Sequence, residues 1–139
     1  MSISLSVVTP EGQAFQGEAD AVVLPGAEGE FGVLPGHEPF LTALRIGTIT
    51  IRQPGGEALF AAVSQGFAEV HEDSVTVMVG SCEFAADIDR EAAEVAAERA
   101  RNQLEEMRAT AEGEDVYQEY QEAYSKAVAR VSISKKFKS

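Results

Sequence analysis

Near residue 85 the spacing of apolar residues along this chain changes from every second position to every third or fourth. Before that point the chain consists of short apolar runs, several of them alternating with polar residues, that break off at glycine or proline. Alternation of period two is typical of strands with one buried face. Beyond it the longer period indicates amphipathic helices. The sequence therefore predicts two domains, residues 1–85 and residues 86–139.

The first domain contains several short strand patterns separated by turn residues. Ile3, Leu5 and Val7 alternate with serines, which places one face of this segment in a core. We predict strands at residues 3–7, 13–18, 19–24, 48–52, 58–63, 67–70 and 75–79. Glycine, proline and polar residues at the breaks are typical of tight turns. Many short strands joined in this way predict an antiparallel β-sandwich.

The sequence pattern of the second domain predicts a hairpin of two α-helices. Asp87 or Asp89 can cap the first helix, which should end near Gly113, and Asp115 can cap the second. The first apolar seam consists of Ala93, Ala97, Ala100, Leu104, Met107 and Ala111. The second stripe consists of Val116, Tyr120, Ala123, Ala127 and Val131. Because the connecting loop is short, the helices should fold back antiparallel. The predicted fold class is therefore mainly β plus α.

The first seam is rich in alanine, which weakens any packing that it makes. Each buried methylene contributes ~0.8 kcal/mol, so alanine in place of leucine removes several such increments per turn. We therefore hypothesise that the hairpin is only marginally docked and can open or dock on another surface. Hydrogen-exchange protection in residues 90–131 as deep as that of the sandwich would contradict this hypothesis.

Charge and hydropathy exclude several classes of protein. The net charge of −12 argues against a nucleic-acid binder, because phosphate backbones require clustered cations. Residues 1–84 carry 11 acidic and 2 basic side chains, whereas residues 85–139 carry 12 and 9, which supports a boundary near residue 85. No apolar run approaches the ~20 residues that cross a bilayer. Without a signal-like N-terminus, we expect the chain to stay where it is made.

The sequence offers few groups suited to catalysis. The two histidines, His37 and His71, have no metal-ligand spacing, and no nucleophile or phosphate-binding motif occurs. The single cysteine, Cys82, excludes an internal disulfide, and its neighbour Phe84 favours a structural role over a nucleophilic one. We therefore predict no catalytic residue, no metal site and no cofactor. A hydrolase that uses paired carboxylates is an alternative, which turnover by the purified chain would support.

Residues 25–39 contain four glycines and three prolines. Glycine permits backbone angles that other residues avoid, and proline fixes its own φ. The composition of this segment therefore predicts a loop with a defined shape. The loop either turns the chain between sheets or presents Glu30, Phe31 and His37 at its tip as a contact surface. Its acidic residues and the lack of a following lysine exclude a phosphate cradle.

Three blocks of the first domain follow one another in a characteristic order. They are VVTPEG at residues 7–12, the pattern LPGxEGxFGVLPGHxP at residues 24–39, and GFAEV with VTVMV within residues 66–79. Together they resemble the epsilon subunit family of F-type ATP synthases, over residues 1 to about 84. The alanine-rich helices extend the resemblance with less specificity. The alternative, a stand-alone β-sandwich binding module, would be stable without partners and would not need a weakly packed hairpin.

The resemblance implies a non-catalytic rotor subunit of a proton-translocating ATP synthase. In this family the sandwich binds the gamma subunit and rests on the ring of c subunits. The hairpin either folds on the sandwich or extends toward the alpha and beta subunits, where it inhibits ATP hydrolysis. Gly29, Glu30, Phe31 and His37 would then face the c-ring. The location implied is the cytoplasmic face of the bacterial inner membrane, reached only through the complex. A plastid-encoded member would likewise have no transit peptide, so targeting alone does not distinguish the two origins.

Two sets of hairpin residues are further candidates. Four basic residues near the C-terminus can meet an acidic surface on a beta subunit: Arg130, Lys135, Lys136 and Lys138. Some family members bind ATP through an Ile-Asp-x-x-Arg-Ala pattern. Here Ala92 stands where the arginine would be, and Arg90 lies ~200° away around the helix, so the pattern matches only in part. Asp89 and Arg99 are the remaining nucleotide candidates.

Overall fold

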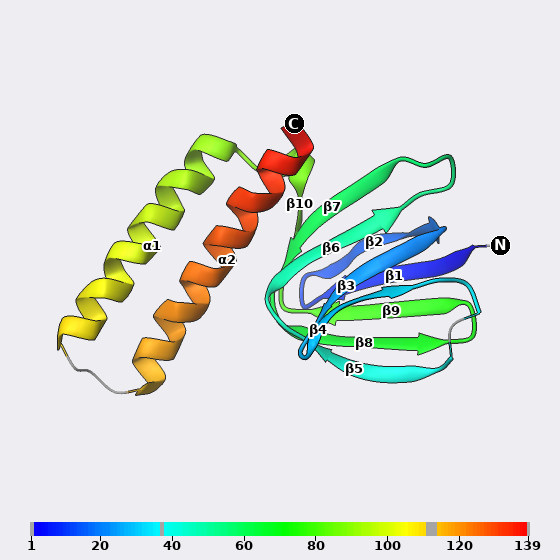
Figure 1. Ribbon diagram of the computed structural model, residues 1–139, viewed down its shortest axis with the longest axis horizontal. Helices are drawn as coiled ribbons and strands as arrows, with labels where there is room; N and C mark the ends of the chain where they lie inside the picture. Colours follow the sequence, from blue (N-terminus) through cyan, green and yellow to red (C-terminus); the bar gives the residue numbers. More distant parts are fainter. Residues whose placement is uncertain (1, 37, 111–113, 139) are drawn as a thin grey trace.

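The computed structural model describes residues 2–36, 38–110 and 114–138, which form a β-sandwich followed by two helices (Figure 1). The strands are β1 (Ile3–Thr9), β2 (Gly12–Ala19), β3 (Ala21–Gly26), β4 (Gly29–Val33), β5 (Phe40–Leu44), β6 (Gly47–Arg52), β7 (Ala58–Val63), β8 (Gly66–His71), β9 (Ser74–Val79) and β10 (Cys82–Phe84). They are followed by the 3-10 helix η1 (Ala85–Asp87) and by α1 (Arg90–Thr110) and α2 (Glu114–Lys138). The predicted fold class is confirmed.

The strands form two layers along one hydrogen-bonded path. Their order is β10-β7-β6-β3-β5-β8-β9-β1-β2, and β4 pairs with β3 beside this path. β3 and β5 share a single residue pair, Gly26 with Leu44, and the sheet folds over at this point. All pairs are antiparallel except β1 with β9, where Leu5 lies beside Val75. The antiparallel prediction is wrong for this pair, because no hairpin turn links the two strands and fixes their direction.

The core between the layers is built by alternate residues of each strand. Leu5 and Val7 of β1, Ile49 and Ile51 of β6, and Val77 of β9 are fully buried. Since successive side chains of a strand point to opposite faces, the intervening residues face outward. The alternation of serine with apolar residues in β1 therefore predicted its buried face correctly.

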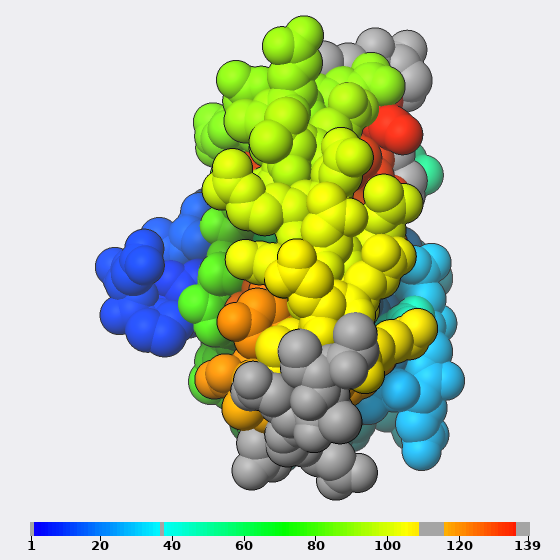
Figure 2. Space-filling view, turned by 90° about the vertical axis from the view of Figure 1, so that its left-hand side faces the viewer, coloured from blue at the N-terminus to red at the C-terminus, as the bar shows by residue number. Residues whose placement is uncertain are grey.

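The helical hairpin stands beside the sandwich, with α2 next to the strands and α1 further out (Figure 1). Seen from the hairpin side, α1 lies in front, with parts of the sandwich visible on either side of it (Figure 2). α2 contacts β6, β7 and η1. In β7, Ala61 and Val63 belong to the sandwich core, whereas Ala62 belongs to a second cluster beneath the helices. β7 is thus buried on both faces.

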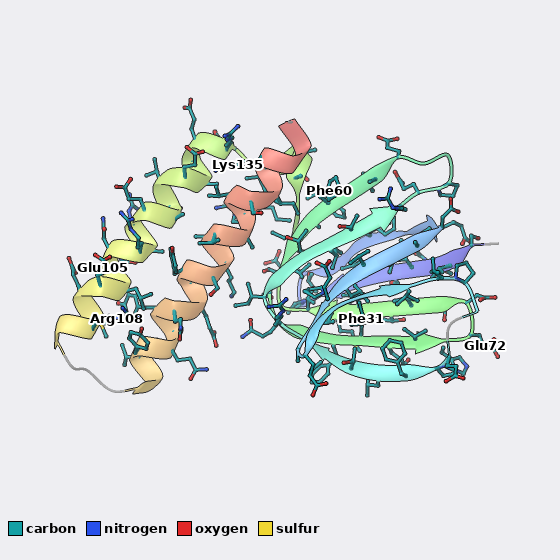
Figure 3. All side chains as sticks on the ribbon, viewed as in Figure 1. Phe31, Phe60, Glu72, Glu105, Arg108 and Lys135 are labelled. Atoms are coloured by element: carbon teal, nitrogen blue, oxygen red, sulfur yellow. The ribbon has the colours of Figure 1, made fainter. Side chains whose placement is uncertain are left out.

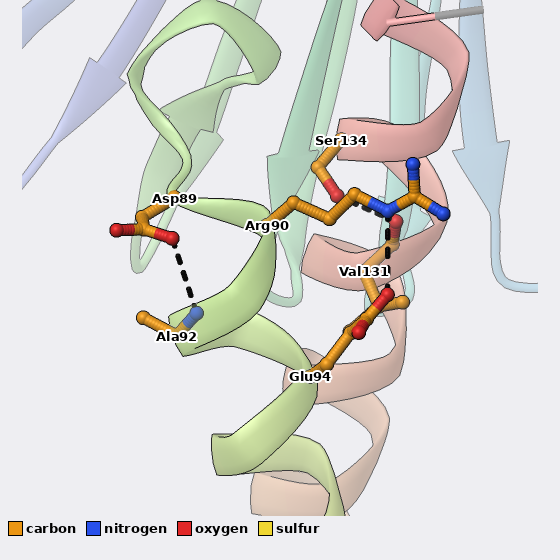
Figure 4. A network of polar contacts seen from close by, with 6 residues as sticks. All are labelled: Asp89, Arg90, Ala92, Glu94, Val131 and Ser134. Carbon is orange, nitrogen blue, oxygen red and sulfur yellow. Dashed lines mark hydrogen bonds and ion pairs between the residues drawn. The ribbon is translucent and has the colours of Figure 1, made fainter.

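The start of α1 is capped as one of the two predicted alternatives requires. Oδ1 of Asp89 accepts a hydrogen bond from the backbone N–H of Ala92 at 3.1 Å, and its carbonyl accepts one from Ala93 at 2.9 Å (Figure 4). The predicted end near Gly113 lies outside the described residues. α2 begins at Glu114, so Asp115 lies inside the helix and the prediction of Asp115 as its cap is wrong. Both acidic residues suit the positive end of the helix dipole.

The apolar seams are only partly as predicted. Ala93 and Ala100 of α1 are buried, and the other described members of its seam are half-buried; Ala111 lies outside the described residues. On α2, Ala127 is buried but Ala123 is exposed, contrary to the prediction. The reason is that α2 packs against both α1 and the sandwich, so its buried residues are spread over two faces. No described helix has a stretch that is both long and apolar enough to cross a membrane.

Candidate functional site

Residues 25–39 form a hairpin and a crossover rather than the single loop that the sequence predicted. Gly26 pairs with Gly29 across the tight β3–β4 turn, and Gly29 has a φ of 140°, a conformation that favours glycine. Glu30 and Phe31 therefore lie on strand β4. The loop prediction was wrong because β4 has glycine at two of its five positions and no alternating apolar pattern.

The two halves of this segment lie at opposite ends of the sandwich. The β3–β4 turn is next to Leu44, at the end of β5, through the pair with Gly26. By contrast, the N–H of Gly36 donates a hydrogen bond to Oδ1 of Asp73 at 2.9 Å, in the turn between β8 and β9. That turn adjoins Phe40, the first residue of β5. The β3–β4 turn and the segment around Gly36 therefore do not form the single contact surface that the sequence predicted.

The four predicted c-ring residues consequently have different surroundings. Gly29 and Glu30 are exposed beside the β3–β4 turn. Phe31 is half-buried and packs edge-to-face on Phe40, with ring centroids 5.5 Å apart. Its ring packs against the sandwich core. His37 lies outside the described residues.

The outer face of β5, β8 and β9 carries a group of exposed apolar side chains. Leu41, Phe67 and Met78 are 65%, 53% and 44% exposed. Phe67 lies directly opposite both Ala43 and Met78, so these side chains share one face of the sheet. We call Leu41, Ala43, Phe67 and Met78 the sheet patch. Contiguous exposed apolar residues mark interaction surfaces.

The sheet patch was not predicted, although the sequences of its strands contain a signal for it. A strand with one solvent face should alternate apolar and polar residues. Phe67-Ala68 and Val77-Met78-Val79 are instead runs of consecutive apolar residues, which place apolar side chains on both faces of their strands. α2 contacts the other layer, at β6 and β7, so the hairpin leaves the patch uncovered.

An ion pair connects the hairpin to the sandwich. Nε of Arg130 on α2 lies 2.5 Å from Oε1 of Glu83 on β10, and its Nη2 lies 3.2 Å from Oε2. We call Glu83 and Arg130 the latch pair. Its side chains are 38% and 33% exposed, so water screens their attraction. The two-pronged geometry is the favourable one for an arginine and a carboxylate.

The apolar contact beneath this ion pair is small. Ile133 of α2 is fully buried, and its cluster also contains Ile88. The other buried members are alanines: Ala62, Ala85 and Ala93. Full burial of one isoleucine contributes about 1.5–3 kcal/mol, and an alanine contributes far less. The docked hairpin is therefore held by a much smaller apolar core than the sandwich itself.

A polar contact joins the two helices near the far end of the hairpin. Nε of Arg108 on α1 donates a hydrogen bond to the hydroxyl of Tyr117 on α2 at 3.0 Å. The guanidinium carbon lies 6.0 Å from the centroid of the tyrosine ring. Arg108 lies far from the sandwich, whereas Lys135 lies near the opposite end of the hairpin (Figure 3). This contact therefore holds the helices to each other and not to the sandwich.

The other predicted hairpin residues are placed as follows. Lys135 is exposed and lines a groove between the helices together with Arg101; the side chains of Lys136 and Lys138 lie outside the described set. Asp89 and Arg99 line one shallow depression on α1, so the structure does bring them together. One oxygen of Asp89 is engaged in the helix cap.

Cys82 has the properties of a structural cysteine. It is half-buried between β7 and α2, where it lines a cavity of about 330 Å³ together with the latch pair. Burial raises the pKa of its thiol to about 11. The thiolate is the reactive form, so a raised pKa makes this cysteine a poor nucleophile at neutral pH.

Comparisons with known proteins identify relatives of the whole chain. A family model for the β-sandwich domain of the ATP synthase delta/epsilon chain matches residues 2–85. The ATP synthase epsilon chain of Synechococcus sp. (strain WH7803) is 39% identical over 97% of this chain and 98% of its own length. The ATP synthase epsilon chain of Syntrophobacter fumaroxidans is 40% identical over 96% of both chains.

Solved structures have the same architecture. One chain in the cryo-EM structure of the Euglena gracilis mitochondrial ATP synthase, described as OSCP/F1/c-ring, matches with a TM-score of 0.75 and 26% identity, over 89% of this chain and 76% of that one. A chain of the Tetrahymena thermophila mitochondrial ATP synthase, described as central stalk/c-ring, matches over 67% of this chain and 70% of its own with a TM-score of 0.53 and 14% identity, and so shares the fold alone.

These matches confirm the resemblance that the three sequence blocks indicated, and the relatives extend it over both helices. The chain belongs to the ATP synthase epsilon chain family, whose members are non-catalytic subunits of the complex.

Proposed function

We propose that this chain is a central-stalk subunit of an F-type ATP synthase, in which the sandwich holds the chain on the gamma subunit and the c-ring while the hairpin restrains ATP hydrolysis. The match to a chain in an F1/c-ring assembly supports the assignment to the rotor. Through that assembly the chain would lie at the membrane without entering it, on the cytoplasmic face of the bacterial inner membrane.

The observation that carries the anchoring role is the sheet patch. Leu41, Phe67 and Met78 expose apolar surface on a rigid sheet, and burial of such surface favours association. We propose that the gamma subunit covers this patch. Glu30 and Gly29, exposed at the β3–β4 turn, supply a polar contact for the c-ring. This turn adjoins the patch, because the N–H of Ala27 donates a hydrogen bond to the carbonyl of Ala43 at 3.0 Å, so the two partners would meet neighbouring surfaces of the sandwich.

A co-purification experiment tests the anchoring role. Tagged wild-type chain from native membranes should bring alpha, beta and gamma subunits in stoichiometric amounts. Phe67→Asp places a charge in the middle of the patch, where burial without a partner is costly, and should release these subunits. Val95→Asp is the matched control, because Val95 is 58% exposed and lies on α1. Retention of gamma by folded Phe67→Asp at the wild-type level would reject the patch as the anchor.

The observation that supports the restraining role is the small junction between hairpin and sandwich. A switch requires two arrangements whose free energies differ by only a few kcal/mol. Two buried isoleucines, three buried alanines and one partly exposed ion pair satisfy this requirement. We propose that α2 leaves the sandwich and reaches the alpha and beta subunits, with the basic C-terminal residues as its contacts. The partial nucleotide pattern receives no role, because Ala92 replaces its arginine and Asp89 caps α1.

A further inference from the structure

The latch pair links parts of the chain that only the docked arrangement brings together. Glu83 and Arg130 are separated by 47 positions in sequence, yet they form two hydrogen bonds. The other ion pair between described residues, Arg90 with Glu94, lies within α1 and does not depend on docking (Figure 4). Movement of α2 away from the sandwich would therefore break the latch pair and leave the α1 pair intact.

The surroundings of the latch pair are accessible to water and poor in negative charge. The adjoining cavity is lined by Lys126 and Arg130 from α2. Among the described residues that line it, Glu83 is the single carboxylate. Arg130 is about 33% exposed, so another anion can reach it when Glu83 moves away. Glu83 is thus the acidic partner that the sandwich offers to the positively charged face of α2.

We propose that Glu83 is an internal competitor for Arg130. In the docked state Glu83 engages the arginine and keeps α2 on the sandwich. In the released state Arg130 is free to pair with an acidic group elsewhere in the complex, and this pairing excludes Glu83. This inference rests on the proposed restraining function and extends it, because it names the residue that sets the balance between the two states.

If the two residues compete in this way, removal of Glu83 and removal of Arg130 should have opposite effects on the restraint of ATP hydrolysis in the complex. Removal of Glu83 loosens the docked state and leaves the arginine available, so restraint of hydrolysis increases. Removal of Arg130 also loosens the docked state, but it deletes the contact that the released helix would make. A simple structural ion pair would instead give the same result from either side.

Hydrogen exchange of the full-length chain tests the latch without the rest of the complex. Glu83→Gln should raise exchange of α2 amides about three- to tenfold, the range for a two-pronged but partly exposed ion pair. The charge-swapped variant Glu83→Arg with Arg130→Glu should return exchange toward the wild-type level. Glu94→Gln, which removes the α1 ion pair, is the matched control and should leave α2 docked. Wild-type exchange in folded Glu83→Gln would overturn the latch.

ATP hydrolysis by the complex then separates the latch from the function on which it rests. Glu83→Gln should slow hydrolysis, whereas the charge-swapped variant should restrain it less than the wild type, because it docks and carries no cation at residue 130. Equal restraint by the charge-swapped and Glu83→Gln variants would overturn the competition. If exchange responds as expected while the intact chain never affects hydrolysis, the restraining function fails and the latch itself is supported.

Discussion

Replacement of Ile133 by alanine is the most direct perturbation of the contact between hairpin and sandwich. The side chain is fully buried in a small cluster with Ile88 and three alanines, against which Phe60 and Val131 pack. Truncation of a buried isoleucine in a fixed core costs about 2–5 kcal/mol. Here α2 can leave the sandwich instead, so the loss cannot exceed the free energy of docking. We expect destabilisation of the docked state by about 2–3 kcal/mol.

Hydrogen exchange resolved by segment measures this effect. A change of 2–3 kcal/mol corresponds to an increase of about 30- to 150-fold in exchange of α2 amides that open by undocking, since every 1.4 kcal/mol is a factor of ten. Amides of β1, β8 and β9 should not change. Val128→Ala on the same helix is the matched control, because Val128 is 44% exposed and its truncation should change stability by less than about 0.5 kcal/mol.

A second variant provides the opposite pattern. Leu5 is fully buried in the sandwich core, so Leu5→Ala should lower the free energy of unfolding of the sandwich by about 2–5 kcal/mol. Sandwich amides would then exchange faster. If Ile133→Ala accelerates exchange in α2 and in the sandwich by equal factors, the two parts unfold as one unit. The inference of a weakly docked hairpin would then be refuted.

Three further outcomes follow from the structure. Gly66→Ala should lower the stability of the sandwich in denaturant unfolding, because the added Cβ would collide with the backbone of Met78. Gly32→Ala is the control, since the space around Gly32 is open, and equal stabilities of the two variants would contradict this reasoning. Alkylation of Cys82 should be slow at pH 8 and should accelerate up to about pH 11, since its raised pKa keeps the thiol protonated; rapid labelling at pH 8 would show an ordinary thiol. Simultaneous neutralisation of the basic C-terminal side chains should weaken inhibition of ATP hydrolysis, and unchanged inhibition would reject their role. These side chains are Arg130, Lys135, Lys136 and Lys138.

The strands that sequence reasoning identified are those with a local signal. β1 alternates regularly, and β8 and β9 flank a polar turn. Three strands carry no such signal. β4 is rich in glycine, β5 is apolar on both faces because it contributes to the core and to the sheet patch, and β10 has only three residues. In each case tertiary contacts, and not local preference, determine the strand.

The candidate site was less accessible to sequence reasoning than the fold. The helical period places residues on a face of a helix, but it does not reveal what that face contacts. Arg130 was predicted to be a cation for a partner, whereas the structure pairs it with Glu83 of β10, 47 positions earlier in the chain. Ala123 was assigned to a single buried stripe, although α2 has two buried faces. Contacts between residues that are distant in sequence leave no local pattern.

ATP hydrolysis by complexes that contain either the intact chain or a chain lacking residues 86–139 tests the division of labour between sandwich and hairpin most directly. The sheet patch and the β3–β4 turn both lie in the part that remains. We expect both chains to co-purify with the gamma subunit and only the intact chain to slow hydrolysis. Equal slowing by the shortened chain, or its failure to bind gamma while folded, would contradict this division.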